Sequence, residues 1–185
     1  MRCFIAVEIP DKIKEVLAST AENFKKAGFN FNYAAKSNMH ITLLFIGECG
    51  KKEALAKFKE SSEKMLNKKF KIGIDGAGNF ETKGVPKILF ADIAEGREEL
   101  CKINETFYAG FENILRKNSL INSFQPHITI GRIKNIEQER TVFFKKIVKE
   151  QKIKAEFEAE KIVMYESILK NSRAEYREIE KIELK

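Results

Sequence analysis

The two histidines of this chain stand in copies of one short pattern. Residues 40–43 read His-Ile-Thr-Leu, and residues 127–130 read His-Ile-Thr-Ile. The copies are 127 − 40 = 87 residues apart, which is close to half of the 185 residues. Such a repeat predicts a weak internal duplication in which the same pattern is kept at one site.

Both patterns have the apolar context of a strand, and alternation along a strand decides what their side chains can do. Residues two positions apart point to the same face of a strand. His40 therefore shares a face with Thr42, and His127 shares a face with Thr129, while the aliphatic residues between them point into the core. Two such strands side by side would bring two imidazoles and two hydroxyls together.

This set of side chains suits metal-free phosphoryl transfer. An imidazole titrates near pH 6.5, so one histidine can act as a base toward water while the other acts as an acid toward a departing ribose oxygen. Threonine hydroxyls can donate hydrogen bonds to the non-bridging phosphate oxygens, where negative charge concentrates. We predict that His40 and His127 are catalytic, that they open a cyclic phosphodiester, and that Thr42 and Thr129 bind its phosphate.

Other kinds of active site find little support in the sequence. There is no cluster of His, Asp and Glu typical of a metal site, no glycine-rich phosphate loop or dinucleotide fingerprint, and no Gly-x-Ser-x-Gly motif. The three cysteines, Cys3, Cys49 and Cys101, are widely spaced and odd in number, so we expect reduced thiols without a disulfide framework. We expect no metal and no cofactor.

The composition narrows the possible partners. Lys and Arg number 34 against 27 Asp and Glu, and the net charge of +7 favours an anion: nucleic acid, a small phosphate ester or an acidic membrane. No apolar run approaches the length of a membrane span, and the first residues lack the pattern of a signal peptide. We expect a cytoplasmic protein with no membrane and no obligate protein partner.

Hydrophobic periodicity predicts an α+β fold that forms one domain over residues 1–185. No Gly/Ser-rich linker divides the chain. The glycine-rich stretch 76–79 predicts a turn, and the Lys- and Glu-rich stretch 145–161 predicts solvated helix and loop faces. The predicted strands are 2–9, 29–33, 39–46, 70–74, 88–93, 127–133, 161–169 and 176–184, with a turn at 170–172 between the last two, and the predicted helices are 11–27, 51–67, 98–117 and 137–149.

Further candidate residues rest on weaker signals. Arg132 suits a phosphate oxygen, but strict alternation places it on the face opposite His127 unless Gly131 bends the strand. Phe45 is out of phase with His40 in the same way, and we expect it in the core. Two aromatic residues are candidates for stacking on a base or for hydrogen bonding: Tyr33 and Tyr165.

At these residues the sequence resembles the 2H phosphoesterase superfamily and, within it, the RNA 2′,3′-cyclic phosphodiesterases, also called the 2′-5′ RNA ligase family. The likeness covers nearly the whole chain. It is carried by residues 2–10 (Arg-Cys-Phe-Ile-Ala-Val-Glu-Ile-Pro), 38–48 (Asn-Met-His-Ile-Thr-Leu-Leu-Phe-Ile-Gly-Glu), 126–132 (Pro-His-Ile-Thr-Ile-Gly-Arg) and 164–167 (Met-Tyr-Glu-Ser), with Tyr176 in the last strand.

The resemblance implies a bilobal α+β fold, in which two pseudo-symmetric lobes line a central cleft with antiparallel sheets and keep their helices outside. It implies hydrolysis of a 2′,3′-cyclic phosphate at an RNA end to a 2′-phosphate without metal, with tRNA fragments among the candidate substrates. It also implies that His40 protonates the leaving oxygen and that His127 activates water, a division that the spacing alone leaves open.

The sequence departs from the family pattern at two positions, and two alternative functions remain to be distinguished. The family often has proline where Lys36 stands and tryptophan where Tyr33 stands, although a tyrosine can still stack on a base. The loop at 83–86, which would influence base preference, is short and charged. The alternatives are a 2′-5′ RNA ligase or RNA-binding module, and a small-molecule cyclic nucleotide phosphodiesterase.

Overall fold

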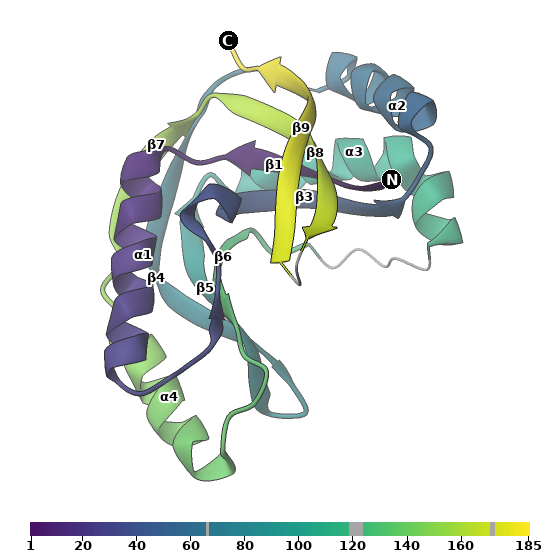
Figure 1. Cartoon of the computed structure of the whole chain (residues 1–185). Coiled ribbons are helices and arrows are strands. Elements are labelled where there is room, and N and C mark those ends of the chain that lie inside the picture. Colours follow the sequence, from purple (N-terminus) through teal and green to yellow (C-terminus); the bar gives the residue numbers. More distant parts are fainter. Residues whose placement is uncertain (66, 119–123, 171–172) are drawn as a thin grey trace.

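The computed structural model describes residues 1–65, 67–118, 124–170 and 173–185 (Figure 1). Parts of the predicted helix 51–67 and of the predicted turn 170–172 lie outside these ranges. The described elements are, in order, β1 (Arg2–Glu8), α1 (Asp11–Lys26), β2 (Asn32–Tyr33), the 3-10 helix η1 (Lys36–Asn38), β3 (His40–Glu48), α2 (Lys51–Glu63), β4 (Phe70–Thr82), β5 (Val85–Glu95), α3 (Arg97–Lys117), β6 (His127–Arg132), α4 (Gln138–Glu150), β7 (Lys154–Ala159), β8 (Lys161–Lys170) and β9 (Arg173–Glu183).

The predicted α+β fold is confirmed. The described strands form one antiparallel sheet in the order β7-β4-β5-β6-β3-β1-β8-β9, and β2 adds to β6. The two sheets implied by the resemblance are the two halves of this sheet, and their strands match in pairs outward from the middle: β6 with β3, β5 with β1, β4 with β8. The strand order therefore has the twofold symmetry that the repeated pattern predicts.

The two halves meet at the repeated pattern itself. β3 pairs with β6 through Ile41 and Ile128, which are equivalent residues of the two copies because 128 − 41 = 87. When a residue pairs with its own equivalent across an antiparallel ladder, the local twofold axis passes between the two residues. This pairing places both histidine strands at the centre of the sheet.

Helices cover one face of the sheet and bury its core. Helices α2 and α3 lie over the half that contains β3, while α1 and α4 lie over the half that contains β6 (Figure 1). Helix α1 buries Ile13, Leu17, Ala21 and Phe24 at spacings of three to four residues, as an amphipathic helix does. Phe58 of α2 stacks on Phe107 of α3 at 5.4 Å between ring centroids, and both rings are fully buried.

The prediction of a turn at 76–79 is wrong, because β4 runs through this stretch to Thr82. Gly76 has a φ of +77°, and the pairing with β5 shifts between Ile74 and Ala77, so the glycine forms a bulge and not a reversal. The chain reverses at Lys83 and Gly84, whose φ values of +51° and +77° are those of a tight hairpin turn.

The prediction of helix and loop faces over 145–161 is also wrong in its second half. Residues 154–159 form the edge strand β7, which pairs with β4. Only Phe157 and Ala159 of this strand are buried. An edge strand pairs with one neighbouring strand and buries only one of its faces, so most of its residues can be charged. Its sequence therefore shows too few apolar residues to predict a strand.

Candidate active site

Four side chains of the repeated pattern share one face of the sheet, here called the histidine face: His40, Thr42, His127 and Thr129. The opposite face, here called the helix face, carries the fully buried Ile41 and Ile128. An antiparallel register through the Ile41–Ile128 pair sets His40 across from Thr129 and Thr42 across from His127. The structure thus brings together the four side chains singled out by their two-residue spacing.

Each imidazole is held by a backbone carbonyl two residues before it. Nδ1 of His40 lies 2.8 Å from the carbonyl oxygen of Asn38, and Nδ1 of His127 lies 2.8 Å from that of Gln125. A carbonyl oxygen can only accept, so Nδ1 carries the proton in both rings. In the neutral ring Nε2 is then the atom that can accept a proton, and in the charged ring it can donate one.

The other ring nitrogen of His40, Nε2, meets a hydroxyl group of the same strand. It lies 2.9 Å from the Thr42 hydroxyl oxygen, so that the hydroxyl can donate to the neutral ring. The side chain of Asn38 also reaches across the sheet, where its Nδ2 donates to the carbonyl oxygen of Ala174 in β9 at 2.7 Å. Asn38 therefore ties the segment that positions His40 to the outer hairpin of its half.

Aromatic rings surround both histidines. Phe4 stacks on His40 at 4.8 Å between centroids, and Tyr176 meets the same ring edge-on at 5.4 Å. Phe80 and Phe90 contact His127 at 4.9 Å and 5.4 Å. These rings remove water from the imidazoles and limit the directions in which they can turn.

This burial lowers the pKa of both imidazoles, because a buried ring loses the water that stabilises its charged form. The pKa of His40 falls from 6.5 to about 4, and the positive charges of His127 and Arg132 push it in the same direction. The pKa of His127 is also lowered, first by burial and then by the charge of Arg132, although the hydrogen bond that its Nδ1 donates to the Gln125 carbonyl favours the charged ring.

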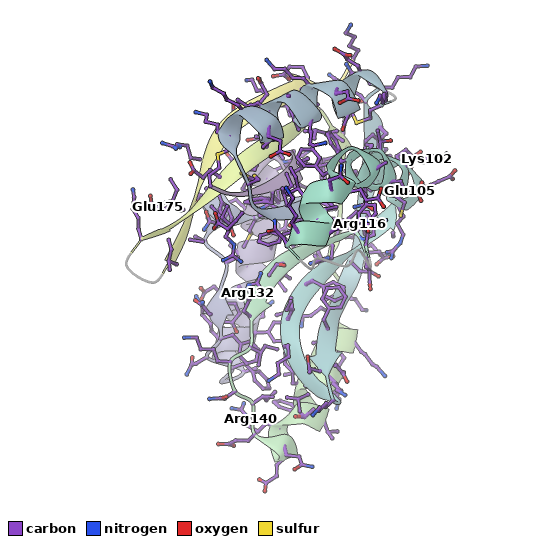
Figure 2. The ribbon with its side chains drawn as sticks, turned by 90° about the vertical axis from the view of Figure 1, so that its right-hand side faces the viewer. Lys102, Glu105, Arg116, Arg132, Arg140 and Glu175 are labelled. Carbon is purple, nitrogen blue, oxygen red and sulfur yellow. The ribbon has the colours of Figure 1, made fainter. Side chains whose placement is uncertain are left out.

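A bulge in β6 brings Arg132 to the histidine face. Thr129 pairs with Phe90 while Gly131 pairs with Leu89, so one extra residue of β6 stands between these two pairs. The next pair joins Arg132 to Ile88, which lies on the same face of β5 as Phe90. Strict alternation, which put Arg132 on the opposite face, does not hold beyond the bulge, and the exposed Arg132 lies where the two halves of the molecule meet (Figure 2).

The equivalent bulge in β3 changes the place of Phe45. Leu43 and Leu44 are both buried on the helix face, and the pairing with β1 passes from Thr42 to Leu44, so that Leu43 is the extra residue. Phe45 was expected in the core, but it is 36% exposed and lies beside Phe4 on the histidine face. The guanidinium of Arg2 sits 5.0 Å from the centre of its ring.

Helix α3 stabilises this bulge through Asn104. The Asn104 side chain is 2% exposed, and its Nδ2 donates to the carbonyl oxygen of Leu43 at 2.7 Å. Replacing Asn104 by leucine leaves that buried carbonyl without its donor, so we expect a loss of about 1–3 kcal/mol in the free energy of unfolding. Urea unfolding measures the loss, and the exposed Glu105→Ala on the same helix should stay within about 0.5 kcal/mol of the parent.

The weaker candidates occupy structural positions. The Tyr33 hydroxyl donates to the carbonyl oxygen of Phe29 at 2.6 Å, and its ring packs on Gly131. Lys36 forms an ion pair with Glu15 at 2.6 Å. Tyr165 alone joins the aromatic group near His40, at 6.3 Å between ring centroids, and burial raises its pKa to about 12.

The residues that hold the histidines in place were not predicted from the sequence. Among them, Asn38 and Gln125 share a detectable signal, because each stands two positions before a histidine of the repeated pattern. The aromatic residues come from other strands: Phe4, Phe80, Phe90 and Tyr176. Phe4 and Tyr176 lie in segments that resemble the family, but no spacing along the chain relates any of the four rings to the histidines.

Two kinds of feature are absent from the described part of the chain. No group of three or more His, Cys, Asp or Glu side chains there is arranged to hold a metal ion. None of the helices in the described ranges is both long and apolar enough to cross a membrane.

Comparison with known proteins identifies the family to which this chain belongs. A model of the 2′-5′ RNA ligase superfamily matches residues 9–170. The chain is 31% identical over 171 residues to an RNA 2′,3′-cyclic phosphodiesterase of Methanocaldococcus jannaschii, covering 91% of this chain and 92% of the relative. It is 30% identical over 140 residues to a protein of the same name from Archaeoglobus fulgidus, covering 75% and 76%.

Solved structures agree with the fold. TT0787 of Thermus thermophilus superimposes with a TM-score of 0.78 at 25% identity, covering 100% of this chain and 98% of that one. LigT of E. coli in its apo form superimposes with a TM-score of 0.76 at 16% identity, covering 98% and 96%. The chain belongs to the 2′-5′ RNA ligase superfamily of two-histidine (2H) phosphoesterases, and it is a phosphodiesterase of that family.

Proposed function

We propose that this enzyme hydrolyses 2′,3′-cyclic phosphates at RNA ends to 2′-phosphates, using His40 and His127 as an acid–base pair without a metal ion. One observation carries the proposal: two imidazoles with fixed tautomers share one face of the sheet with two threonine hydroxyls and a guanidinium. The names of the relatives from Methanocaldococcus jannaschii and Archaeoglobus fulgidus support the substrate class.

His127 is proposed as the base. Its neutral Nε2 takes a proton from a water molecule as the water oxygen attacks phosphorus. The lowered pKa of His127 keeps the ring neutral near pH 7, as a base requires. The attack then forms the new bond from oxygen to phosphorus on the side opposite the departing ribose oxygen.

His40 is proposed as the acid, following the family resemblance. Its charged Nε2 donates a proton to the 3′-oxygen as the bond from that oxygen to phosphorus breaks, which leaves a 2′-phosphate and a free 3′-hydroxyl. Its pKa of about 4 in the absence of substrate makes the charged form scarce. A bound phosphate places a negative charge beside the ring, which favours the charged form and raises this pKa.

Arg132 and the two threonines are proposed to bind the phosphate. Its non-bridging oxygens gain negative charge during the attack, and donors already aimed at them stabilise that charge. Thr42 lies across from His127, and Thr129 lies across from His40. A phosphate bound between the two histidines would therefore meet one threonine hydroxyl on each side. The net charge of +7 favours an extended anion such as RNA over a small cyclic nucleotide.

A direct test uses a short RNA ending in a 2′,3′-cyclic phosphate, incubated with the enzyme in excess EDTA. We expect conversion to the 2′-phosphate, which resists a phosphomonoesterase specific for 3′-phosphates. A 2′,3′-cyclic mononucleotide is the matched substrate for the small-molecule alternative, and we expect a lower kcat/KM on it. Turnover that needs added metal, or a 3′-phosphate product, would contradict the proposed mechanism.

The dependence of kcat/KM on pH is a second test. Catalysis needs one charged and one neutral imidazole, and the pKa of each free histidine is lowered, that of His40 to about 4. Below the lower pKa both rings are charged and no base remains; above the higher pKa both are neutral and no acid remains. We therefore expect kcat/KM to peak on the acid side of pH 6.5, the ordinary pKa of histidine.

The position of this peak does not depend on which histidine is the acid, because both assignments require one proton on the pair. The maximum of kcat should lie at higher pH than that of kcat/KM, since bound phosphate raises both pKa values. Initial rates from about pH 4 to pH 9 at constant ionic strength measure both profiles. A maximum of kcat/KM well above pH 7 would contradict the lowered pKa values as the controlling groups.

A further inference from the structure

Cys3 and Cys49 lie far apart in the sequence and side by side in the fold, away from the proposed catalytic groups. Their Sγ atoms are 3.4 Å apart. Cys3 pairs with Gly47 across the β1–β3 ladder, and backbone hydrogen bonds of 2.8 Å and 2.9 Å join Met1 and Cys49 in both directions. The backbone of two adjacent strands therefore brings the two thiols together.

The two thiols differ in access and in acidity. Cys3 is fully buried in the core on the helix face, while Cys49 is half-buried at the end of β3. The hydrogen bond with Cys3 lowers the pKa of the Cys49 thiol, whereas the same bond and burial raise the pKa of Cys3. The Cys49 sulfur can thus be reached by a small oxidant and ionises more easily, whereas the Cys3 sulfur beside it is shielded from solvent.

We propose that Cys3 and Cys49 are a modification site that forms a reversible disulfide when the protein meets hydrogen peroxide or another small peroxide. The sulfurs need to approach from 3.4 Å to the roughly 2.05 Å of an S–S bond, a shift that two side-chain rotations can supply. The site is independent of the proposed phosphodiesterase chemistry.

The reaction has two steps. The Cys49 thiolate attacks one oxygen of hydrogen peroxide, the O–O bond breaks, and Cys49 becomes a sulfenic acid, while the departing hydroxide takes up the proton that the thiol had released and leaves as water. The Cys3 sulfur then attacks the Cys49 sulfur, the S–S bond forms, and the S–O bond breaks. The Cys3 proton joins the departing hydroxide as a second water, so two thiols and one hydrogen peroxide give one disulfide and two waters.

The test treats the folded, full-length protein with a small molar excess of hydrogen peroxide and then counts thiols under denaturing conditions. We expect the count to fall from the three of the sequence to one, with the mass lowered by two hydrogen atoms. Peptide mapping should find Cys3 joined to Cys49 and Cys101 free, and dithiothreitol should restore all three thiols.

Single substitutions separate the roles of the two sulfurs. In Cys3→Ser the sulfenic acid of Cys49 has no partner, so dimedone should trap it. In Cys49→Ser the buried Cys3 should stay reduced at the same dose. Cys101→Ser is the matched control, and its disulfide should form as in the parent.

Thermal unfolding gives an independent readout. A cross-link between Cys3 and Cys49 restricts the unfolded chain, so the oxidised parent and Cys101→Ser should melt roughly 5–10 °C above their reduced forms, while Cys3→Ser should show no such gain. The proposal is overturned if the parent keeps three thiols at a dose that modifies Cys49 in Cys3→Ser, or if Cys49 is oxidised to a sulfinic acid while Cys3 remains free.

Discussion

Replacing either His40 or His127 by alanine is expected to lower kcat for hydrolysis of the cyclic phosphate by about 10²–10⁴-fold, because each variant lacks either the acid or the base. Binding of the RNA should change much less, since Arg132 and the threonines remain. Single-turnover rates at saturating enzyme measure the loss directly. The double variant should be only slightly slower than the slower single variant, because the two rings act as one unit.

Two measurements separate a chemical effect from a structural one. Urea unfolding should show that each alanine variant remains folded, although His40 is packed against Phe4 and Tyr176 and some stability is lost. Lys36→Ala is the matched surface control, because Lys36 precedes the same strand but forms an ion pair with Glu15. A folded His127→Ala that keeps kcat within tenfold of the parent would remove this histidine from the mechanism.

Arg132→Ala is expected to lower kcat/KM by about 10²–10³-fold, the usual effect of removing one donor from developing oxyanion charge. Because the charge of Arg132 lowers the pKa of both histidines, its removal should also move both limbs of the kcat/KM profile to higher pH. Arg132→Lys keeps the positive charge but loses the planar guanidinium, which can donate two hydrogen bonds at once. The pH profile of this variant should therefore be close to that of the parent, while its kcat/KM should remain lower.

The control for Arg132 is Arg116→Ala. Arg116 lies exposed on α3, where it pairs with Glu112 at 2.7 Å (Figure 2). Both variants lose one positive charge, so a general electrostatic effect on RNA binding would appear in both. Equal losses in kcat/KM would show that Arg132 contributes only to net charge, and an unshifted pH profile in Arg132→Ala would place its guanidinium too far from the imidazoles to act on phosphate.

The repeated pattern was readable from the sequence because its signal is local. A histidine and a threonine two residues apart share a face in any strand, whatever the strand pairs with. The offset of 87 residues also anticipated the symmetry of the sheet, whose two halves meet at Ile41 and Ile128. Helices and central strands followed from apolar spacing, which depends only on which face of an element is buried.

The errors arose where neighbours in space override local spacing. The positions of Phe45 and Arg132 depend on bulges, and a bulge is set by the pairing of two strands and by partners such as Asn104, whose donor reaches Leu43 from a distant helix. The same holds for the glycines of β4, which bend a paired strand where local rules predict a turn.

The amino-acid sequence by itself determined which groups could do the chemistry: two histidines, two threonines and the alternation that aims each pair at one face. Only the tertiary structure decided their surroundings, because burial and register are properties of non-local contacts. It lowered the pKa of His40 by packing Phe4 against it, turned Arg132 toward the histidines, and brought Cys3 within 3.4 Å of Cys49. These contacts cannot be predicted from spacing along the chain, since they join strands that are neighbours only in the folded sheet.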